Sequence, residues 1–207
     1  MNGPVLTHPP LAFGVMGSAS GELDPVVTEA VRQLGTAIAE AGCTLITGAC
    51  PGLPFAAVEG AKAAGGLVVG ISPALSETEH VQRYEAPVDG FDVIVYTGSG
   101  LMGREVVNIR SSDIVVIAGG RSGTLGEFAI AYDEGRLVGV LTGTGGVADM
   151  VDELVERMRK DTGAHVLFDD DPRRLVQRLV EYYRSAHYLR PSSLHELPGA
   201  RPGGGGA

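Results

Sequence analysis

The sequence predicts an α/β fold: a single Rossmann-like domain in which an open parallel sheet is flanked by helices on both faces. Two observations lead to this prediction. Short apolar runs alternate along the chain with segments of helical apolar spacing. Glycine-rich turns follow several of these runs, in keeping with 31 glycines among 207 residues. Repeated strand, turn and helix units joined by right-handed crossovers build a sheet of this kind.

The apolar runs are short enough to be strands. The run at 67–71 is apolar throughout, as expected when both faces of a parallel sheet are covered. In chain order, the predicted strands are residues 11–16, 43–47, 67–71, 91–96, 114–118, 137–141 and 165–168.

The helices between the strands are recognised by their end signals and their spacing. The first has Asp24 at its N-cap and Pro25 at its first helical position, and Gly42 lies just past its end. Asp171 and Pro172 begin the last helix in the same way. The acidic run at 169–171 is better explained by the dipole of that helix than by a cation site. Further helices are predicted through 56–64, over 101–111, from Thr124 onward, over 147–160 and from Pro172 to about residue 187.

One long segment, residues 72–90, interrupts the alternation because it is polar and carries charged residues and prolines. We expect a surface loop that can cover a site, since long loops often have a function. His80 lies in this segment, and a lone loop histidine is more often solvated than catalytic.

Length and charge limit the possible classes of protein. The domain is expected over residues 11–190, with 1–10 as a flexible leader and 191–207 as a disordered tail rich in glycine and proline. A formal charge of -9 argues against a nucleic-acid surface. The apolar runs are shorter than the about 20 residues that span a bilayer, and there is no signal peptide. We therefore expect a cytoplasmic protein without a nucleic-acid or membrane partner.

The stretch 113–134 contains the main candidate for a ligand-binding motif. A strand at 114–118 enters a glycine-rich turn, and Thr124 then opens a helix. Such a junction directs backbone N–H groups and the positive end of the helix dipole at one spot, which suits a phosphate group. Glu127 follows in the first helical turn, so its carboxylate can face whatever the turn holds. The same pattern also suits a structural turn in which the glutamate is only a capping partner.

Other glycine-rich loops also follow strands, so they should lie at the carboxyl edge of the sheet, where ligands bind in this architecture. None of them has the GxGxxG spacing with an acidic residue about 20 positions later, which disfavours a standard dinucleotide site. Cys50 in one of them is more simply a small buried residue than a reactive thiol. The two cysteines, Cys43 and Cys50, form no metal-spaced cluster, and no metal is expected. These loops begin near Gly17, Gly48, Gly98 and Gly119.

Over about residues 11–160 the chain resembles the Lonely Guy family and the wider group that includes molybdenum-cofactor carrier proteins. The family motif PGGxGTxxE falls on Gly119 to Glu127 without gaps, and Arg104 stands at the position of the family's upstream arginine. Gly119 replaces the motif's proline, Arg121 its second glycine, and Glu105 a lysine that is usual in cytokinin-activating members. With the stretches ITGACPGLP and GGRSGTLGEF, these departures place the chain nearer the carrier-like branch.

This resemblance implies hydrolysis of the N-glycosidic bond of a nucleoside 5′-monophosphate, which releases a base and ribose 5-phosphate. Arg104 and Glu127 would be catalytic, no cofactor or metal would be needed, and the protein would be a homodimer or a higher homo-oligomer. The alternative is a module that holds a nucleotide or a phosphorylated pterin-type cofactor without turnover. A third reading gives Glu127 only a structural role beside Arg104 in a dimer. The residues expected at the phosphate or nucleotide are Gly17, Ser18, Gly48, Gly120, Arg121, Ser122, Gly123 and Thr124.

Overall fold

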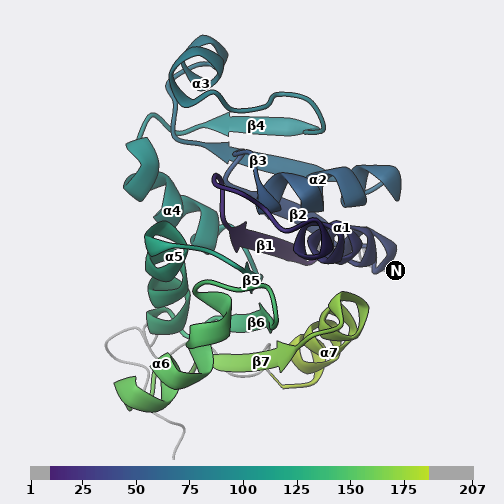
Figure 1. The fold of residues 1–207 in the computed structure, drawn as a ribbon, viewed down its shortest axis with the longest axis vertical. Coiled ribbons are helices and arrows are strands. Elements are labelled where there is room, and N and C mark those ends of the chain that lie inside the picture. Colours follow the sequence, from purple (N-terminus) through teal and green to yellow (C-terminus); the bar gives the residue numbers. More distant parts are fainter. Residues whose placement is uncertain (1–9, 187–207) are drawn as a thin grey trace, which may run out of the picture.

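The computed structural model describes residues 10–186 and has one parallel sheet of seven strands in the order β4-β3-β2-β1-β5-β6-β7 (Figure 1). The predicted fold class is therefore confirmed. The proposed leader, apart from Pro10, and the proposed tail lie outside the described residues. The strands are β1 Ala12–Gly17, β2 Thr44–Thr47, β3 Val68–Ser72, β4 Val93–Tyr96, β5 Ile114–Ala118, β6 Leu137–Leu141 and β7 His165–Asp169.

Helices cover both faces of the sheet (Figure 1). One face carries α1, α2 and α7, and the other carries α4, α5 and α6, so each face buries its own apolar cluster. Within the described residues, no helix has both the length and the apolar character needed to cross a membrane. The helices are α1 Pro25–Glu40, α2 Leu53–Ala63, α3 Glu77–Tyr84, α4 Gly100–Arg110, α5 Ser122–Asp133, α6 Val151–Met158 and α7 Pro172–Ser185.

The centre of the sheet is the pair β1 and β5, where the strand order reverses. Gly17 at the end of β1 pairs with Ala118 at the end of β5, so the two strands stop together. The loops that follow them consequently leave the sheet side by side. Ligands bind in the crevice beyond such a reversal in open α/β sheets, and this register positions the site described below.

Two glycines let α1 and α2 pack at close range. A Cβ atom on Gly35 of α1 would lie 1.9 Å from the carbonyl oxygen of Ala57, and one on Gly60 of α2 would lie 1.9 Å from that of Arg32. Neither distance is possible for a real side chain. The backbones of the two helices therefore touch, and the loops at the start of both helices are fixed relative to each other.

Residues 72–90 are not simply a loop, because they contain α3. Ser76 caps this helix by accepting a hydrogen bond from the N–H of Glu79. His80 is fully buried rather than solvated, so that expectation was wrong. Its Nε2–H donates to the carbonyl oxygen of Pro87 (3.0 Å), and its Nδ1 accepts from the hydroxyl of Ser72 (2.8 Å). The histidine thus holds this segment onto the end of β3.

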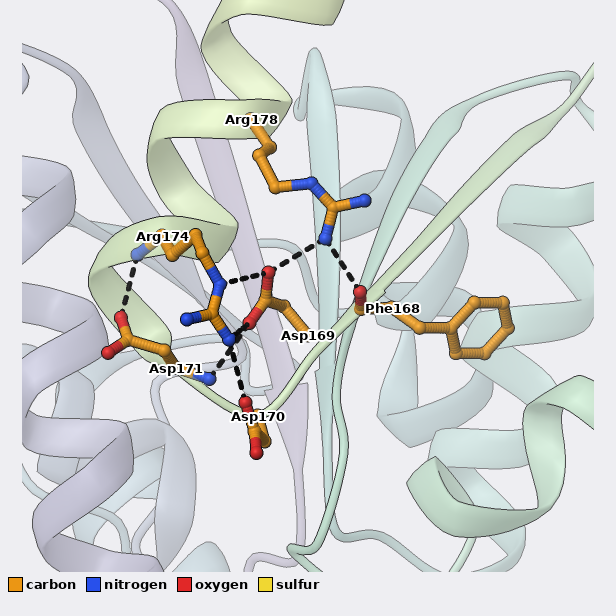
Figure 2. Close-up of polar contacts among 6 residues, drawn as sticks. All are labelled: Phe168, Asp169, Asp170, Asp171, Arg174 and Arg178. Carbon is orange, nitrogen blue, oxygen red and sulfur yellow. Dashed lines mark hydrogen bonds and ion pairs between the residues drawn. The ribbon is translucent and has the colours of Figure 1, made fainter.

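The acidic run after β7 binds arginines of α7 (Figure 2). The buried carboxylate of Asp169 accepts from Nε of Arg174 at 2.9 Å and from Nη1 of Arg178 at 2.7 Å. Asp170 also pairs with Arg174 (2.8 Å). Asp171 caps α7 through the N–H of Arg174. These contacts give the run a structural role at the start of the helix.

Candidate functional site

A cavity of about 330 Å³ lies at the carboxyl edge of the sheet, beside the β1 and β5 ends. The loops after β1, β2 and β5 line it, together with one face of α4. The loop that begins near Gly98 does not line it, because β4 is at the edge of the sheet. Nine of the ten predicted site residues line this cavity, and Gly120 is the exception.

The N-terminus of α5 opens into the cavity. Its first hydrogen bond runs from the N–H of Leu125 to the carbonyl of Arg121 at 2.9 Å. The N–H groups of Ser122, Gly123 and Thr124 precede that bond and have no acceptor within the helix. These three amides and the helix dipole form a cradle for an anionic group. We call Ser122 to Thr124 the amide cradle.

Gly120 shapes the cradle without lining it. Its φ of +102° is one that glycine tolerates, and a Cβ there would lie 2.5 Å from Cβ of Thr124. Its N–H donates to Oγ of Ser18 at 3.0 Å. The amide of Gly120, which the sequence assigned to the phosphate, is therefore already paired with the loop after β1.

Arg104 and Glu127 meet inside the cavity. Arg104 Nη1 on α4 donates to Glu127 Oε1 on α5 at 3.2 Å, and both side chains are about nine-tenths buried. Gly48 makes room for the arginine, since a Cβ at that position would lie 2.1 Å from Nη1. Nε of Arg104 is buried and has no hydrogen-bond partner among the described residues.

Burial controls the protonation of Glu127. Desolvation raises the pKa of its carboxyl from 4.5 to about 7, while Arg104 opposes this shift and Glu105 adds to it. Near neutral pH the group is therefore present in both its protonated and its ionised form. A carboxyl with this property can donate or accept a proton.

The guanidinium of Arg121 does not reach freely into the cavity. Its Nη2 donates to Oγ of Ser20 (2.7 Å) and to the carbonyl oxygen of the same residue. Arg121 thereby joins the loop after β5 to the loop after β1 across the cavity mouth. Cys50 also lines the cavity, where desolvation raises the pKa of its thiol to about 11, so the thiol stays protonated at neutral pH. Within residues 10–186, no group of three His, Cys, Asp or Glu side chains could hold a metal ion.

Residues 10–176 match the sequence profile of the SLOG cluster4 family. The chain belongs to the SLOG cluster4 family. An uncharacterized protein of Archaeoglobus fulgidus is 36% identical to this SLOG cluster4 protein over 131 residues, which are 63% of this chain and 80% of that protein.

Solved structures with the same fold include two that are named for the molybdenum cofactor. The molybdenum cofactor binding protein from the phototrophic bacterium Rippkaea orientalis is 28% identical, covers 86% of this chain and 100% of its own, and has a TM-score of 0.71. The molybdenum cofactor carrier protein from Chlamydomonas reinhardtii is 26% identical, with coverages of 85% and 99% and a TM-score of 0.67. The predicted membership in the Lonely Guy and carrier-like superfamily is confirmed.

The SLOG cluster4 site contains one acidic residue that the sequence analysis left without a role. Glu105 lines the cavity next to Arg104 and is only 9% exposed. Desolvation raises the pKa of its carboxyl, and Arg104 lowers it. Glu105 directly follows Arg104 in the sequence, and this adjacency to a predicted site residue was the available signal.

Proposed function

We propose that this SLOG cluster4 protein binds a phosphorylated small molecule of the molybdenum-cofactor class and acts as a binding or carrier protein for it. The observation that carries the proposal is the amide cradle, Ser122 to Thr124, which opens into the same cavity as the buried pair Arg104 and Glu127. The cradle suits the phosphate of such a ligand. The cavity volume of about 330 Å³ falls at the lower end of the usual range for small-molecule sites.

Two further observations favour binding over turnover. The relatives from Rippkaea orientalis and Chlamydomonas reinhardtii are named for binding or carrying the molybdenum cofactor, and the similarity spans nearly their whole length. In addition, Arg121 and Ser20 brace the mouth of the cavity. The guanidinium of Arg121 can strengthen the binding of an anionic ligand in its ground state, and uniform binding does not accelerate chemistry.

A second candidate function is hydrolysis of a nucleoside 5′-monophosphate, and the raised pKa of Glu127, about 7, favours it. The cradle would anchor the 5′-phosphate and so position the ribose. Water would add to C1′ as the bond from C1′ to the base breaks, and the base would leave with a proton. Glu127, whose pKa lies near neutral pH, would orient the attacking water and accept its proton, and Arg104 would orient Glu127.

One experiment separates the two functions. Purified protein is incubated with AMP, GMP and ribose 5-phosphate, its thermal stability is measured, and the solution is chromatographed for free base. Protein from cells is also oxidised and its released pterins are measured by fluorescence. Raised thermal stability or a copurified pterin without base release supports the carrier. Base release that Glu127→Gln abolishes supports the hydrolase, and a protein with no ligand effect and no base release would contradict both.

A further inference from the structure

Glu105 is a largely buried side chain whose carboxylate has no hydrogen-bond donor among the described residues. It is 9% exposed and lines the cavity, yet it has no hydrogen bond or ion pair with any residue between 10 and 186. Burial raises the pKa of this carboxyl and the charge of Arg104 lowers it, but Arg104 supplies no hydrogen bond, and buried polar groups in native proteins are normally hydrogen-bonded. The missing partner is best supplied by whatever fills the cavity.

The neighbouring helix offers Glu105 no side-chain donor. The two carboxylate oxygens face α5 at Gly123 and Gly126, where a Cβ atom would lie 3.5 and 3.4 Å from Oε1 and Oε2. Glycine has no side chain that could donate a hydrogen bond. The carboxylate therefore keeps its acceptor capacity for the cavity, where two parallel donors can meet its two oxygens.

The wall around Glu105 suits a flat ring. Leu101 lies one helical turn earlier on the same face of α4, lines the same cavity and is 56% exposed. Pro54 adds apolar surface from the start of α2. A heterocycle lying against Leu101 would therefore be within reach of the Glu105 carboxylate.

We propose that Glu105 selects ligands whose ring has a 2-amino-4-oxopyrimidine edge, the edge shared by pterins and guanine. That edge carries an amino N–H beside a ring N–H, and two parallel donors match one carboxylate in a charge-assisted pair. Adenine presents a ring acceptor beside its amino group, and hypoxanthine lacks the 2-amino group. This inference rests on the proposed function, because the amide cradle must hold the phosphate of the same ligand.

The negative charge of Glu105 suits the recognition of a 2-amino-4-oxopyrimidine edge. A lysine at this position would repel such an edge and attract phosphate, whereas Glu105 does the reverse. Desolvation raises the pKa of the Glu105 carboxyl, so the donors of a bound ring would stabilise its ionised form.

Isothermal titration of the full chain with GMP, IMP, AMP and ribose 5-phosphate tests the inference. We expect GMP to bind at least about tenfold more tightly than IMP or AMP, because those analogues leave Glu105 unpaired. Glu105→Gln should reduce the GMP affinity by about tenfold or more and bring GMP and IMP within about threefold of each other. The affinity of the variant for ribose 5-phosphate should not fall.

Glu156→Gln is the matched control, since it removes the same charge from an exposed position on α6. It should bind all four ligands like the natural protein. If chromatography shows that a nucleotide is cleaved, kcat/KM replaces affinity in the same comparison. Equal binding of GMP and IMP by the natural protein, with ribose 5-phosphate still bound, would overturn the role of Glu105 and leave the cradle intact. Failure of all four ligands to bind, together with the absence of a copurified pterin, would overturn the proposed function as well.

Discussion

Arg104 Nη1 and Glu127 Oε1 are 3.2 Å apart, and this contact joins α4 to α5 within the cavity. The strand before α4 is β4 at the sheet edge, whereas the strand before α5 is β5 at its centre. The pair therefore connects an outer element to the point where the strand order reverses. Because both side chains are nearly buried, the protonation state of the Glu127 carboxyl affects both the stability of the protein and the chemistry of the site.

Glu127 should make stability fall as pH rises through the slightly acidic range. Its carboxyl has a pKa of about 7 in the folded protein and about 4.5 when unfolded, so the folded state binds the proton more tightly. The resulting stabilisation is fully present below pH 4.5 and is lost as pH rises toward 7. The loss should be on the order of 3 kcal/mol.

Denaturant unfolding of the natural protein and of Glu127→Gln, at pH 5 and pH 7.5, measures this effect. The amide imitates the protonated carboxyl, so the variant should lack the decline. The difference in unfolding free energy between the two proteins should therefore change with pH in favour of the variant. A difference that stays constant over this range would show that Glu127 titrates normally.

Gly48→Ala should break the pair between Arg104 and Glu127. The added Cβ would lie 2.1 Å from Nη1 of Arg104, which can only move away. The guanidinium lies at the end of a flexible side chain, so we expect a destabilisation of about 1–3 kcal/mol with the fold retained.

A double-mutant cycle isolates this cause. In an Arg104→Ala background, Gly48→Ala should cost much less, because the side chain that it displaces is gone. Unfolding by denaturant gives the four free energies. Equal costs in both backgrounds would place the effect of Gly48 in the backbone rather than at Arg104.

The strands could be predicted because their signal is local. The run at 114–118 and the run at 137–141 are apolar throughout, and both became strands with the predicted bounds. The short helix α3 was missed within residues 72–90 because its composition is polar. Its end signal was nevertheless present, since Ser76 and Glu79 have the spacing of a capping box.

The site could be predicted only in part. Glycine-rich turns at strand ends identified the cradle, because the parallel sheet brings such turns to one edge. Contacts between distant segments had no local signal. Neither the bond from Arg121 to Ser20 nor the unpaired state of Glu105 follows from spacing. Both depend on how the loops after β1 and β5 and the helix α4 pack together.

Asp169→Asn should make the protein less stable at neutral pH. Two arginines, Arg174 and Arg178, hold the pKa of the buried Asp169 carboxyl well below its usual value. The stabilisation is present above the unfolded pKa of about 3.8 and is lost as pH falls through the folded pKa. We expect a cost of about 1–3 kcal/mol, at the lower end because both arginines are more than a third exposed.

Unfolding at pH 7 and at pH 3 tests the Asp169 network, with Asp170→Asn as the control. Asp170 is 80% exposed and, within residues 10–186, pairs only with Arg174, so its loss should cost little. Asp169→Asn should differ from the natural protein more at pH 7 than at pH 3. The prediction would be refuted by an equal cost for the two substitutions at pH 7.

Gly35→Ala should lower the free energy of unfolding more than Gly48→Ala or Gly126→Ala does. The added methyl group would collide with the backbone of another helix. The new Cβ would lie 1.9 Å from the carbonyl oxygen of Ala57, so α1 and α2 would have to separate. Backbone cannot move aside as a side-chain end can, and interiors are close-packed. We expect a loss of at least about 3 kcal/mol, measured by thermal or denaturant unfolding.

Gly126→Ala in α5 is the comparison for Gly35→Ala. Among the residues that the structure describes, a Cβ there would meet only the end of the Glu105 side chain, at 3.4 Å. Alanine also favours helix over glycine by roughly 0.5–1 kcal/mol, so this variant should be neutral or slightly more stable. The higher helix preference of alanine also acts in Gly35→Ala, but there the collision with the Ala57 carbonyl oxygen should outweigh it. A Gly35→Ala protein as stable as Gly126→Ala would mean that α1 and α2 separate at little cost and that their close approach does not fix the loops around the site.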